Sequence, residues 1–266
     1  MNATKRGDFL THKNIIDFQV SGRYALFTDP ITRIGGEKAT YQIPTYQALK
    51  GILESVYWKP TLIWVIDRVR VMNPIITESK HIRPINYNDG MNTLSVYTYL
   101  VNPVYQVQAH FIWNENRPEF KHEQNCNNEY KHYFIAKRMI ERGGRRDIFL
   151  GTRECQGYVE PCVFGEGKGA YDNSGVMTFG LAFHGFNYPD ETGRDVLGVR
   201  FWRPVMINGI VEFIPPDKCD RQLCRDIRPM KKKQFDSFTG LDEPALKKLI
   251  EEVEADELDK CVNRDL

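Results

Sequence analysis

The chain has 266 residues, of which 41% are hydrophobic, and this length favours two small domains over one large one. The formal net charge of +1 does not by itself indicate a nucleic-acid partner, but the acidic run EEVEADELDK near the C-terminus leaves a basic body before it. The first residues lack the apolar segment of a signal peptide, and no apolar run approaches the roughly 20 residues of a membrane helix. We therefore expect a soluble, cytoplasmic protein whose six cysteines are free thiols in a reducing compartment.

Several classes of enzyme have recognisable motifs that this sequence lacks. It contains no phosphate-binding loop, dinucleotide fingerprint, HExxH zinc motif or GxSxG nucleophile turn. The glycine-containing run GEGKGAYDNSG follows no strand-to-helix pattern and is interpreted as a loop. Four residues separate Cys219 from Cys224 and six separate Cys155 from Cys162, so neither pair has the two-residue spacing of a zinc knuckle. We therefore expect neither a metal nor a cofactor.

In the first 165 residues, stretches with helical periodicity alternate with stretches typical of strands. In chain order these stretches predict a strand at 15–27, a helix at 45–58, a strand at 61–71, two strands within 94–114, a helix from Asn127 or Asn128 to Gly143, and a strand at 147–150. Thr45 can cap the first helix, and Pro60 ends it. The segment 73–91 is expected to be a loop, and a second glycine turn is expected after the last strand.

This order of strand, helix, strand, strand, helix and strand is the split βαβ pattern of the ferredoxin-like fold, an α+β architecture. In that fold two helices cover one face of the sheet, and the other face stays open for a ligand or a second domain. RNA-binding modules such as RRM domains use the same layout. We therefore predict a ferredoxin-like, RRM-like N-terminal domain over residues 12–165.

After Gly165 the character of the sequence changes. It predicts strands at 176–186, 196–206 and 210–214. Asn208 and Gly209 suit a tight hairpin turn between the last two strands. We expect a small antiparallel β-sheet domain over 166–232, packed on the first domain. The remaining residues, 233–266, are expected to form a linker and an acidic tail that is helical or disordered, because they include few large apolar residues.

The clearest chemical suggestion comes from Lys131 and His132, in the first turn of the second predicted helix. The unpaired N–H groups and partial positive charge of a helix N-terminus attract phosphate. The same field disfavours a charged imidazole, so His132 would be neutral and able to accept a proton. The alternative is a surface histidine beside a solvated lysine.

Two groups of basic residues are candidates for contacts with a nucleic-acid backbone. The first group consists of Arg145, Arg146 and Arg153, which flank the short strand at 147–150 among glycines. Guanidinium groups beside tight turns suit phosphate binding. The second group, in the predicted loop, consists of Lys80, His81 and Arg83. The alternatives are a solvated charged face for the first group and an ordinary polar loop for the second.

Four long phrases of the sequence resemble the CRISPR-associated Cas-five family, subtype I-C, which is also called Dvulg and is part of the RAMP superfamily. They are YALFTDPITRIGGEKATYQIPTYQALKGILESVYWKP, VRVMNPI, GGRRDIFLGTRECQGYVEP and HGFNYPDETG. The resemblance covers residues 15–232, and its motifs are long and specific. The N-terminal dozen residues and the acidic tail lie outside it.

The resemblance implies an activity. In this subtype the protein replaces the usual repeat-cleaving nuclease and cuts precursor CRISPR RNA at the base of the repeat hairpin, without a metal. It then stays on the 5′ handle as a subunit of the interference complex, beside the backbone and large subunits, where it could also contact target DNA. The implied fold is a ferredoxin-like domain with a glycine-rich loop, followed by a small β-sheet domain.

The family's catalytic residues are a tyrosine, a lysine and a histidine, and they fall on Tyr57, Lys131 and His132. Tyr46 lies on the same predicted helix as Tyr57 and is counted among the expected RNA contacts. Metal-free cleavage needs a base for the RNA 2′-hydroxyl and positive charge near the phosphorane oxygens. His132 is the expected base, or the acid for the leaving oxygen, and the expected products are a 2′,3′-cyclic phosphate and a 5′-hydroxyl.

The alternative function is a non-catalytic subunit that binds the 5′ handle, because other subtypes of the family cap the guide RNA without cutting it. A ferredoxin-like protein of unrelated function is a third hypothesis, for which the long motifs leave little room. The presence of Tyr57, Lys131 and His132 together favours the enzyme.

Overall fold

The computed structural model describes residues 14–30, 32–85, 90, 93–117 and 129–232. The chain divides into two compact units, of which the first ends at Lys231 and the second comprises Lys232–Leu266. The predicted linker and tail, and the predicted caps Asn127 and Asn128, lie outside the described residues. The predicted boundary after residue 165 falls within the first unit. None of the described helices is long and apolar enough to span a membrane.

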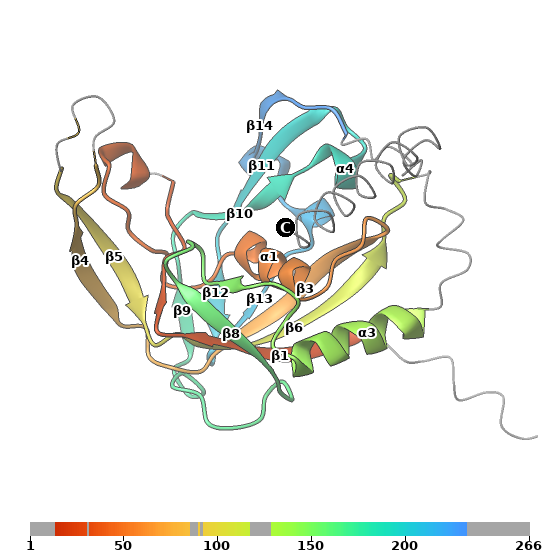
Figure 1. Cartoon of the computed structure of the whole chain (residues 1–266), viewed down its shortest axis with the longest axis horizontal. Coiled ribbons are helices and arrows are strands. Elements are labelled where there is room, and N and C mark those ends of the chain that lie inside the picture. Colours follow the sequence, from red (N-terminus) through yellow and green to blue (C-terminus); the bar gives the residue numbers. More distant parts are fainter. Residues whose placement is uncertain (1–13, 31, 86–89, 91–92, 118–128, 233–266) are drawn as a thin grey trace, which may run out of the picture. The chain divides into compact units, whose positions relative to one another are not determined.

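An eight-stranded sheet runs through the first unit (Figure 1). From one edge to the other its strands are β7 (Ile148–Phe149), β8 (Gln156–Pro161), β1 (Ile15–Gly22), β6 (Val104–Trp113), β3 (Leu62–Val71), β13 (Ile210–Glu212), β12 (Val205–Ile207) and β9 (Val176–Thr178). All of these strands pair in antiparallel fashion. The protein is therefore an α+β protein with antiparallel sheets.

Two helices pack their apolar sides into the core of this sheet. They are α1 (Tyr46–Val56) and α3 (Glu129–Glu141), and their buried residues join one hydrophobic cluster with the inward-facing residues of β1, β3, β6 and β8. Thr45 caps α1 as predicted, because its side chain accepts a hydrogen bond from the Ala48 N–H at 3.2 Å. In chain order β1, α1, β3, β6, α3 and β8 follow the predicted alternation of strands and helices.

Strand β6 alternates its side chains between the two faces of the sheet. Its inward-facing residues are Tyr105, Val107, Ala109 and Phe111, all at most 2% exposed. The residues between them carry polar contacts on the other face of the sheet, where Gln108 accepts from Arg68 at 2.9 Å and donates to Asp17 at 2.8 Å. One face of the sheet thus packs against the helices, and the other is polar.

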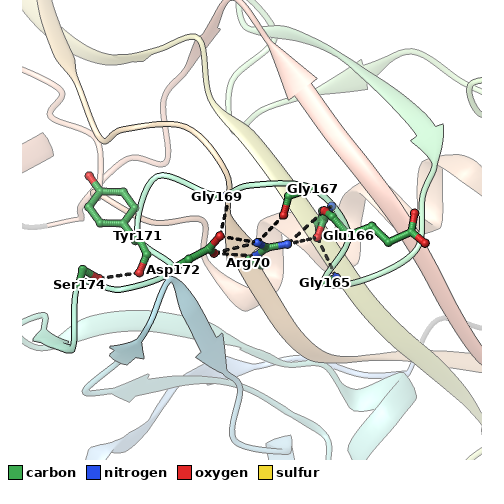
Figure 2. A network of polar contacts seen from close by, with 9 residues as sticks. Arg70, Gly165, Glu166, Gly167, Gly169, Tyr171, Asp172 and Ser174 are labelled. Carbon is green, nitrogen blue, oxygen red and sulfur yellow. Dashed lines mark hydrogen bonds and ion pairs between the residues drawn. The ribbon is translucent and has the colours of Figure 1, made fainter.

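A loop covers part of this polar face and is held by Arg70 (Figure 2). The Arg70 side chain is buried, and its guanidinium donates to both carboxylate oxygens of Asp172 at 2.8 Å. It also donates to the carbonyl oxygens of Glu166 and Gly167, at 3.1 and 2.9 Å. The run GEGKGAYDNSG therefore forms a loop, as predicted, but one that is fixed to strand β3.

The prediction of a loop over 73–91 is wrong for its first half, which contains strand β4 (Thr77–Ile82). This strand pairs with β5 (Ser95–Val101), which also pairs with β2 (Tyr24–Ala25), and the three form a separate sheet. β4 lies at the edge of that sheet and is mostly exposed, so its residues show no apolar alternation. Backbone pairing, rather than burial, defines this strand.

The strand predicted at 147–150 is only the two-residue edge strand β7, and the glycine turn expected after it is present at Gly151, which has φ +96°. The strand that pairs with β1 is β8, which follows that turn. Gly157 lies in β8 because the strands pack closely around Leu150. A Cβ atom on Gly157 would lie 2.9 Å from the Leu150 Cγ atom, and one on Gly22 would lie 2.6 Å from the Leu150 Cδ1 atom. The two glycines therefore allow close packing within strands rather than a turn.

The C-terminal strands divide between two sheets. Those at 176–186 and 196–206 were predicted as single strands, but each is broken, and β9 and β12 extend the eight-stranded sheet through β13. The other three, β10 (Ala182–Asn187), β11 (Val196–Trp202) and β14 (Cys224–Pro229), form their own sheet. The predicted hairpin turn at Asn208 and Gly209 is confirmed, since φ is positive at both residues, +47° and +80°. Short helical segments are η1 (Thr32–Gly35), α4 (Pro189–Thr192), η3 (Pro216–Lys218) and η4 (Arg221–Leu223).

Candidate active site

Tyr57 and His132 come from two different helices and meet in the interior. Tyr57 directly follows α1 and has extended backbone angles, φ −152° and ψ 122°, while its N–H still bonds to Leu53 O at 2.8 Å. His132 lies in the first turn of α3. The Tyr57 hydroxyl oxygen is 2.7 Å from Nδ1 of His132, a hydrogen bond between two residues expected to act together.

An aromatic cage surrounds this pair. The Trp64 Nε1–H donates to the Tyr57 carbonyl oxygen at 2.7 Å, and the Trp64 ring contacts Phe111 edge to face. Phe111 and Trp113 both contact the His132 imidazole at steep angles, with ring centroids 6.2 and 5.5 Å away. Strands β3 and β6 therefore support the tyrosine backbone and the imidazole ring from one side.

The pair is largely buried, with Tyr57 5% exposed and His132 3% exposed, whereas the neighbouring Lys131 is exposed. The direction of the Tyr57–His132 hydrogen bond decides what the other ring nitrogen offers. If the hydroxyl donates to Nδ1, then Nε2 carries the proton; if Nδ1–H donates to the hydroxyl, then Nε2 is the unprotonated nitrogen and can accept a proton. The same geometry can therefore present an acid or a base.

The turn after α3 brings a positive charge to Tyr57. Gly143 and Gly144 have φ values of +79° and +103°, which suit glycine, and Arg146 N–H donates to Ser55 O at 3.2 Å. Burial raises the pKa of the Tyr57 hydroxyl, while the charge of Arg145 acts in the opposite direction. Arg145 thus lies close enough to interact with the Tyr57 hydroxyl. Both arginines are exposed.

Arg153 and Lys80 lie near a second glycine turn. Gly151 has φ +96°, and a Cβ atom there would come within 2.0 Å of Leu26 O. The turn therefore passes directly against the backbone at Leu26. The exposed Arg153 guanidinium carbon lies 6.0 Å from the centre of the Phe149 ring. Burial is the main cause of the raised pKa of the Cys155 thiol, and the charge of Lys80 opposes it, which places Lys80 near the same turn.

The three basic residues predicted in a loop do not act as one cluster. In β4, Lys80 pairs with Tyr97 and His81 pairs with Val96, so their side chains point to opposite faces of the sheet. The Lys80 ammonium lies 3.2 Å from the centre of the Tyr24 ring. Arg83 follows the strand and, like His81, is exposed.

Tyr46, expected as an RNA contact, does not fit that role. Its side chain is 1% exposed and stacks on His184 with ring centroids 4.4 Å apart and an interplanar angle of 18°. Burial raises the pKa of its hydroxyl. The first turn of α1 faces the core at this position, so Tyr46 contributes to packing between α1 and strand β10.

Sequence reasoning did not identify Trp64, Phe111 and Trp113 as neighbours of His132. They lie in predicted strands and were interpreted as ordinary core residues. Trp64 and Phe111 lie directly opposite each other in the register of β3 and β6, a relationship that only the structure shows. Within the described residues, no group of three or more His, Cys, Asp or Glu side chains is arranged to hold a metal ion.

Comparisons with known proteins agree with the resemblance of the motifs. Residues 15–214 match the Cas5d family model, described as CRISPR-associated protein (Cas_Cas5). A protein of Mannheimia succiniciproducens named CRISPR pre-crRNA endoribonuclease Cas5d is 41% identical over 66 residues, which are 25% of this chain and 28% of that protein. A protein of Thermus thermophilus with the same name is 27% identical over 62% of this chain and 72% of its own length.

Two solved structures share the fold. One, described as a CRISPR-associated protein, is 31% identical and has a TM-score of 0.64. The other, a functionally uncharacterized protein from Streptococcus mutans, is 35% identical and has a TM-score of 0.61. Each comparison covers 80% of this chain and 97% of the other. The family model alone matches most of the chain, and the chain therefore belongs to the Cas5d family of CRISPR-associated proteins.

Proposed function

We propose that this protein is a metal-independent endoribonuclease that cleaves precursor CRISPR RNA at the base of the repeat hairpin. The observation that supports this most directly is the 2.7 Å hydrogen bond between the Tyr57 hydroxyl and Nδ1 of His132. It joins the tyrosine and histidine expected to be catalytic, with Lys131 next in the chain. The relatives in Mannheimia and Thermus that are named pre-crRNA endoribonucleases support the same substrate.

In the proposed reaction the 2′-oxygen of the RNA attacks the adjacent phosphorus, and the bond from phosphorus to the 5′-oxygen breaks. The 2′-hydroxyl gives up its proton, the 5′-oxygen gains one, and the products are a 2′,3′-cyclic phosphate and a 5′-hydroxyl. His132 transfers one of these protons, and Tyr57 holds the imidazole in one tautomer and orientation. Lys131 and Arg145 stabilise the negative charge of the phosphorane oxygens.

We propose that the RNA backbone runs over basic residues at the surface. The exposed ones are Arg145, Arg146, Arg153, His81 and Arg83, and Lys80 is half-buried, whereas the buried Tyr46 is left out. Binding through phosphate contacts predicts strong salt dependence, and a hairpin is recognised mainly by its shape. Strand order β8-β1-β6-β3 with α1 and α3 is that of a ferredoxin-like domain, which we infer for residues 12–165.

We further propose that the protein stays on the 5′ handle of the cleaved RNA as a subunit of the type I-C interference complex in the cytoplasm. Its partners there are the backbone and large subunits, and it could touch target DNA. The division into a second, small β-sheet domain over 166–232 also stays a prediction, because strands of that region belong to both sheets.

The test is cleavage of the organism's own repeat RNA by the purified full-length protein in EDTA. We expect one discrete cut at the hairpin base, and a single 2′-deoxy substitution at that position should abolish it. Cutting that continues at the deoxy position would exclude attack by the 2′-hydroxyl. Cutting that appears only after a divalent ion is added would exclude the metal-independent mechanism.

A second candidate function, a handle-binding subunit without catalysis, is favoured by one observation. Tyr57 and His132 are only 5% and 3% exposed, although a nuclease must bring its acid or base against the RNA. Tight binding of the repeat RNA without any cut would support this function over the enzyme.

A further inference from the structure

An open groove of about 500 Å³ follows the less buried side of α1. Its volume lies within the range of roughly 300–1,000 Å³ that is usual for small-ligand sites. At one end the lining includes Ser55, which lies two residues before Tyr57 in the chain. The Ser55 carbonyl oxygen accepts a hydrogen bond from Arg146 N–H, in the turn after α3. One end of the groove is thus lined by a residue close to Tyr57 in the chain, although neither Tyr57 nor His132 lines the groove itself.

The floor of the groove is built from small residues of α1, namely Ala48, Gly51 and Ser55. Gly51 lies in the interior of the helix, where glycine is the least favourable residue apart from proline. No packing constraint requires it, because a Cβ atom at this position would meet nothing within 4 Å outside the helix backbone. Its backbone is ordinary helix, so no positive φ requires glycine either. Gly51 thus lowers helix stability and leaves the groove floor open.

The lining has the chemistry of a nucleotide site. Two partly exposed phenylalanines, Phe149 and Phe183, contribute aromatic surface on which a base can pack, whereas Phe27, which also lines the groove, is buried. Arg33 is the one charged side chain among the lining residues, all of which the structure describes, so the lining suits an anion rather than a cation. Hydroxyl groups of Thr28, Thr45, Ser55 and Thr152 add polar partners.

We infer that this groove holds one unpaired nucleotide of the RNA flank next to the cleaved phosphodiester, with Gly51 leaving the space for its base. The inference rests on the proposed RNA substrate and adds a subsite to it. An unpaired base is preferred over a paired one because a groove of this size, lined by separate aromatic rings, takes one ring system and not a duplex.

The test fills the groove without weakening the helix. Gly51→Leu introduces a better helix former where a Cβ meets no neighbour, so its Tm should equal or exceed that of the wild type. Gly180→Leu is the control, because a Cβ atom at Gly180 likewise meets nothing within 4 Å, and Gly180 lies outside the groove. Binding is measured at fixed salt with a repeat RNA that carries a 2′-deoxy group at the cut and one abasic position at a time in either flank.

We expect one flank position at which loss of the base weakens wild-type binding about tenfold, the size of one base–aromatic contact. Gly51→Leu should weaken binding of the intact RNA by about as much, and the abasic change at that position should then have no further effect. Gly180→Leu should behave as wild type. Binding of the intact RNA by Gly51→Leu at wild-type strength, or an undiminished abasic effect in it, would overturn the groove assignment. Because the RNA cannot be cut, these results do not depend on whether the wild type proves to be a nuclease.

Discussion

The Tyr57 hydroxyl and the Nδ1 atom of His132 lie 2.7 Å apart, although the two residues are 75 positions apart in the chain. The contact links the end of α1 to the first turn of α3. Phe111 and Trp113 of β6 pack against the His132 imidazole. Because one ring nitrogen is engaged by the tyrosine, the tautomer of His132 is coupled to the orientation of the Tyr57 hydroxyl.

Tyr57→Phe should slow RNA cleavage while leaving RNA binding near the wild-type level. The change removes the hydrogen bond that orients the imidazole but keeps the ring that packs beside it. Loss of the residue that fixes the tautomer of a catalytic histidine can cost up to about 10⁴-fold in rate. The measurement is single-turnover cleavage at saturating protein. Tyr171→Phe is a suitable control, because it also removes a hydrogen-bonded tyrosine hydroxyl. That hydroxyl accepts from Ile75 N–H rather than bonding to His132. Equal cleavage rates for the two variants would contradict the prediction.

Trp64→Phe tests whether Trp64 positions Tyr57. A phenylalanine keeps aromatic packing against Phe111 but removes the N–H that bonds to the Tyr57 carbonyl. We expect kcat to fall about 10- to 100-fold with KM unchanged, because small misplacements of a reacting group cost this much.

The control for that variant is Trp202→Phe. Trp202 is also a buried tryptophan, but it stacks on Phe213 and contacts His184 rather than the active-site pair. Both changes should lower Tm by similar amounts, so only a positioning role separates their kcat values. If Trp202→Phe reduced kcat as strongly as Trp64→Phe, the effect would be one of general stability.

His184 should make the stability of the protein depend on pH. Burial, aided by the charge of Arg200, lowers the pKa of His184 from 6.5 to about 3 in the folded protein. Between these values the unfolded chain binds a proton that the folded chain does not, so stability is fully present above pH 6.5 and falls as the pH drops toward 3. The slope from this residue is at most about 1.4 kcal/mol per pH unit.

His184→Gln removes this titration and should flatten the dependence of the unfolding free energy on pH between about 6.5 and 4. The variant will be less stable at neutral pH because the ring contact with Tyr46 is lost, so the slope rather than the absolute value is compared. His81→Gln, a change at an exposed position, serves as control. An unchanged slope in His184→Gln would show that the pH dependence arises elsewhere.

Arg70→Met should lower Tm and expose the loop that Arg70 holds to trypsin cleavage at Lys168. Arg70 is buried and donates to Asp172 and to two loop carbonyl groups, which would lose their partner. Arg194→Met offers a matched comparison, since Arg194 pairs with Asp226 at 2.9 Å, but the two side chains are 61% and 57% exposed. Removing an exposed pair costs at most about 1 kcal/mol. Similar Tm losses for both variants would contradict the role assigned to Arg70.

Much of the fold could be predicted from the sequence because periodicity and caps are local properties. Helix α1 with its Thr45 cap, strands β3 and β6 and the Asn208–Gly209 turn all follow from patterns of this kind. Strand β4 was missed because an exposed edge strand has no buried face to produce alternation. The strand pairing that places β9 and β10 in different sheets depends on contacts between distant segments, and no local sequence pattern predicts it.

The candidate site was predictable only in part. His132 was identified from its place in the first turn of a predicted helix and Tyr57 from the family resemblance, whereas their contact is a feature of the tertiary structure. The cage residues Trp64, Phe111 and Trp113 could not be separated from core residues by sequence, because an aromatic side chain in a strand is typical of either role. The prediction that Tyr46 contacts RNA was wrong, although its helical spacing with Leu49 and Leu53 already indicates that it lies in the core.

The most direct test of the nuclease assignment compares the wild type with His132→Ala on the organism's own repeat RNA in EDTA. We predict a discrete cut by the wild type that leaves a 2′,3′-cyclic phosphate, and no cut by His132→Ala, although that variant binds the RNA as the wild type does. Cleavage by His132→Ala at the wild-type rate, or binding by the wild type without any cut, would contradict the account.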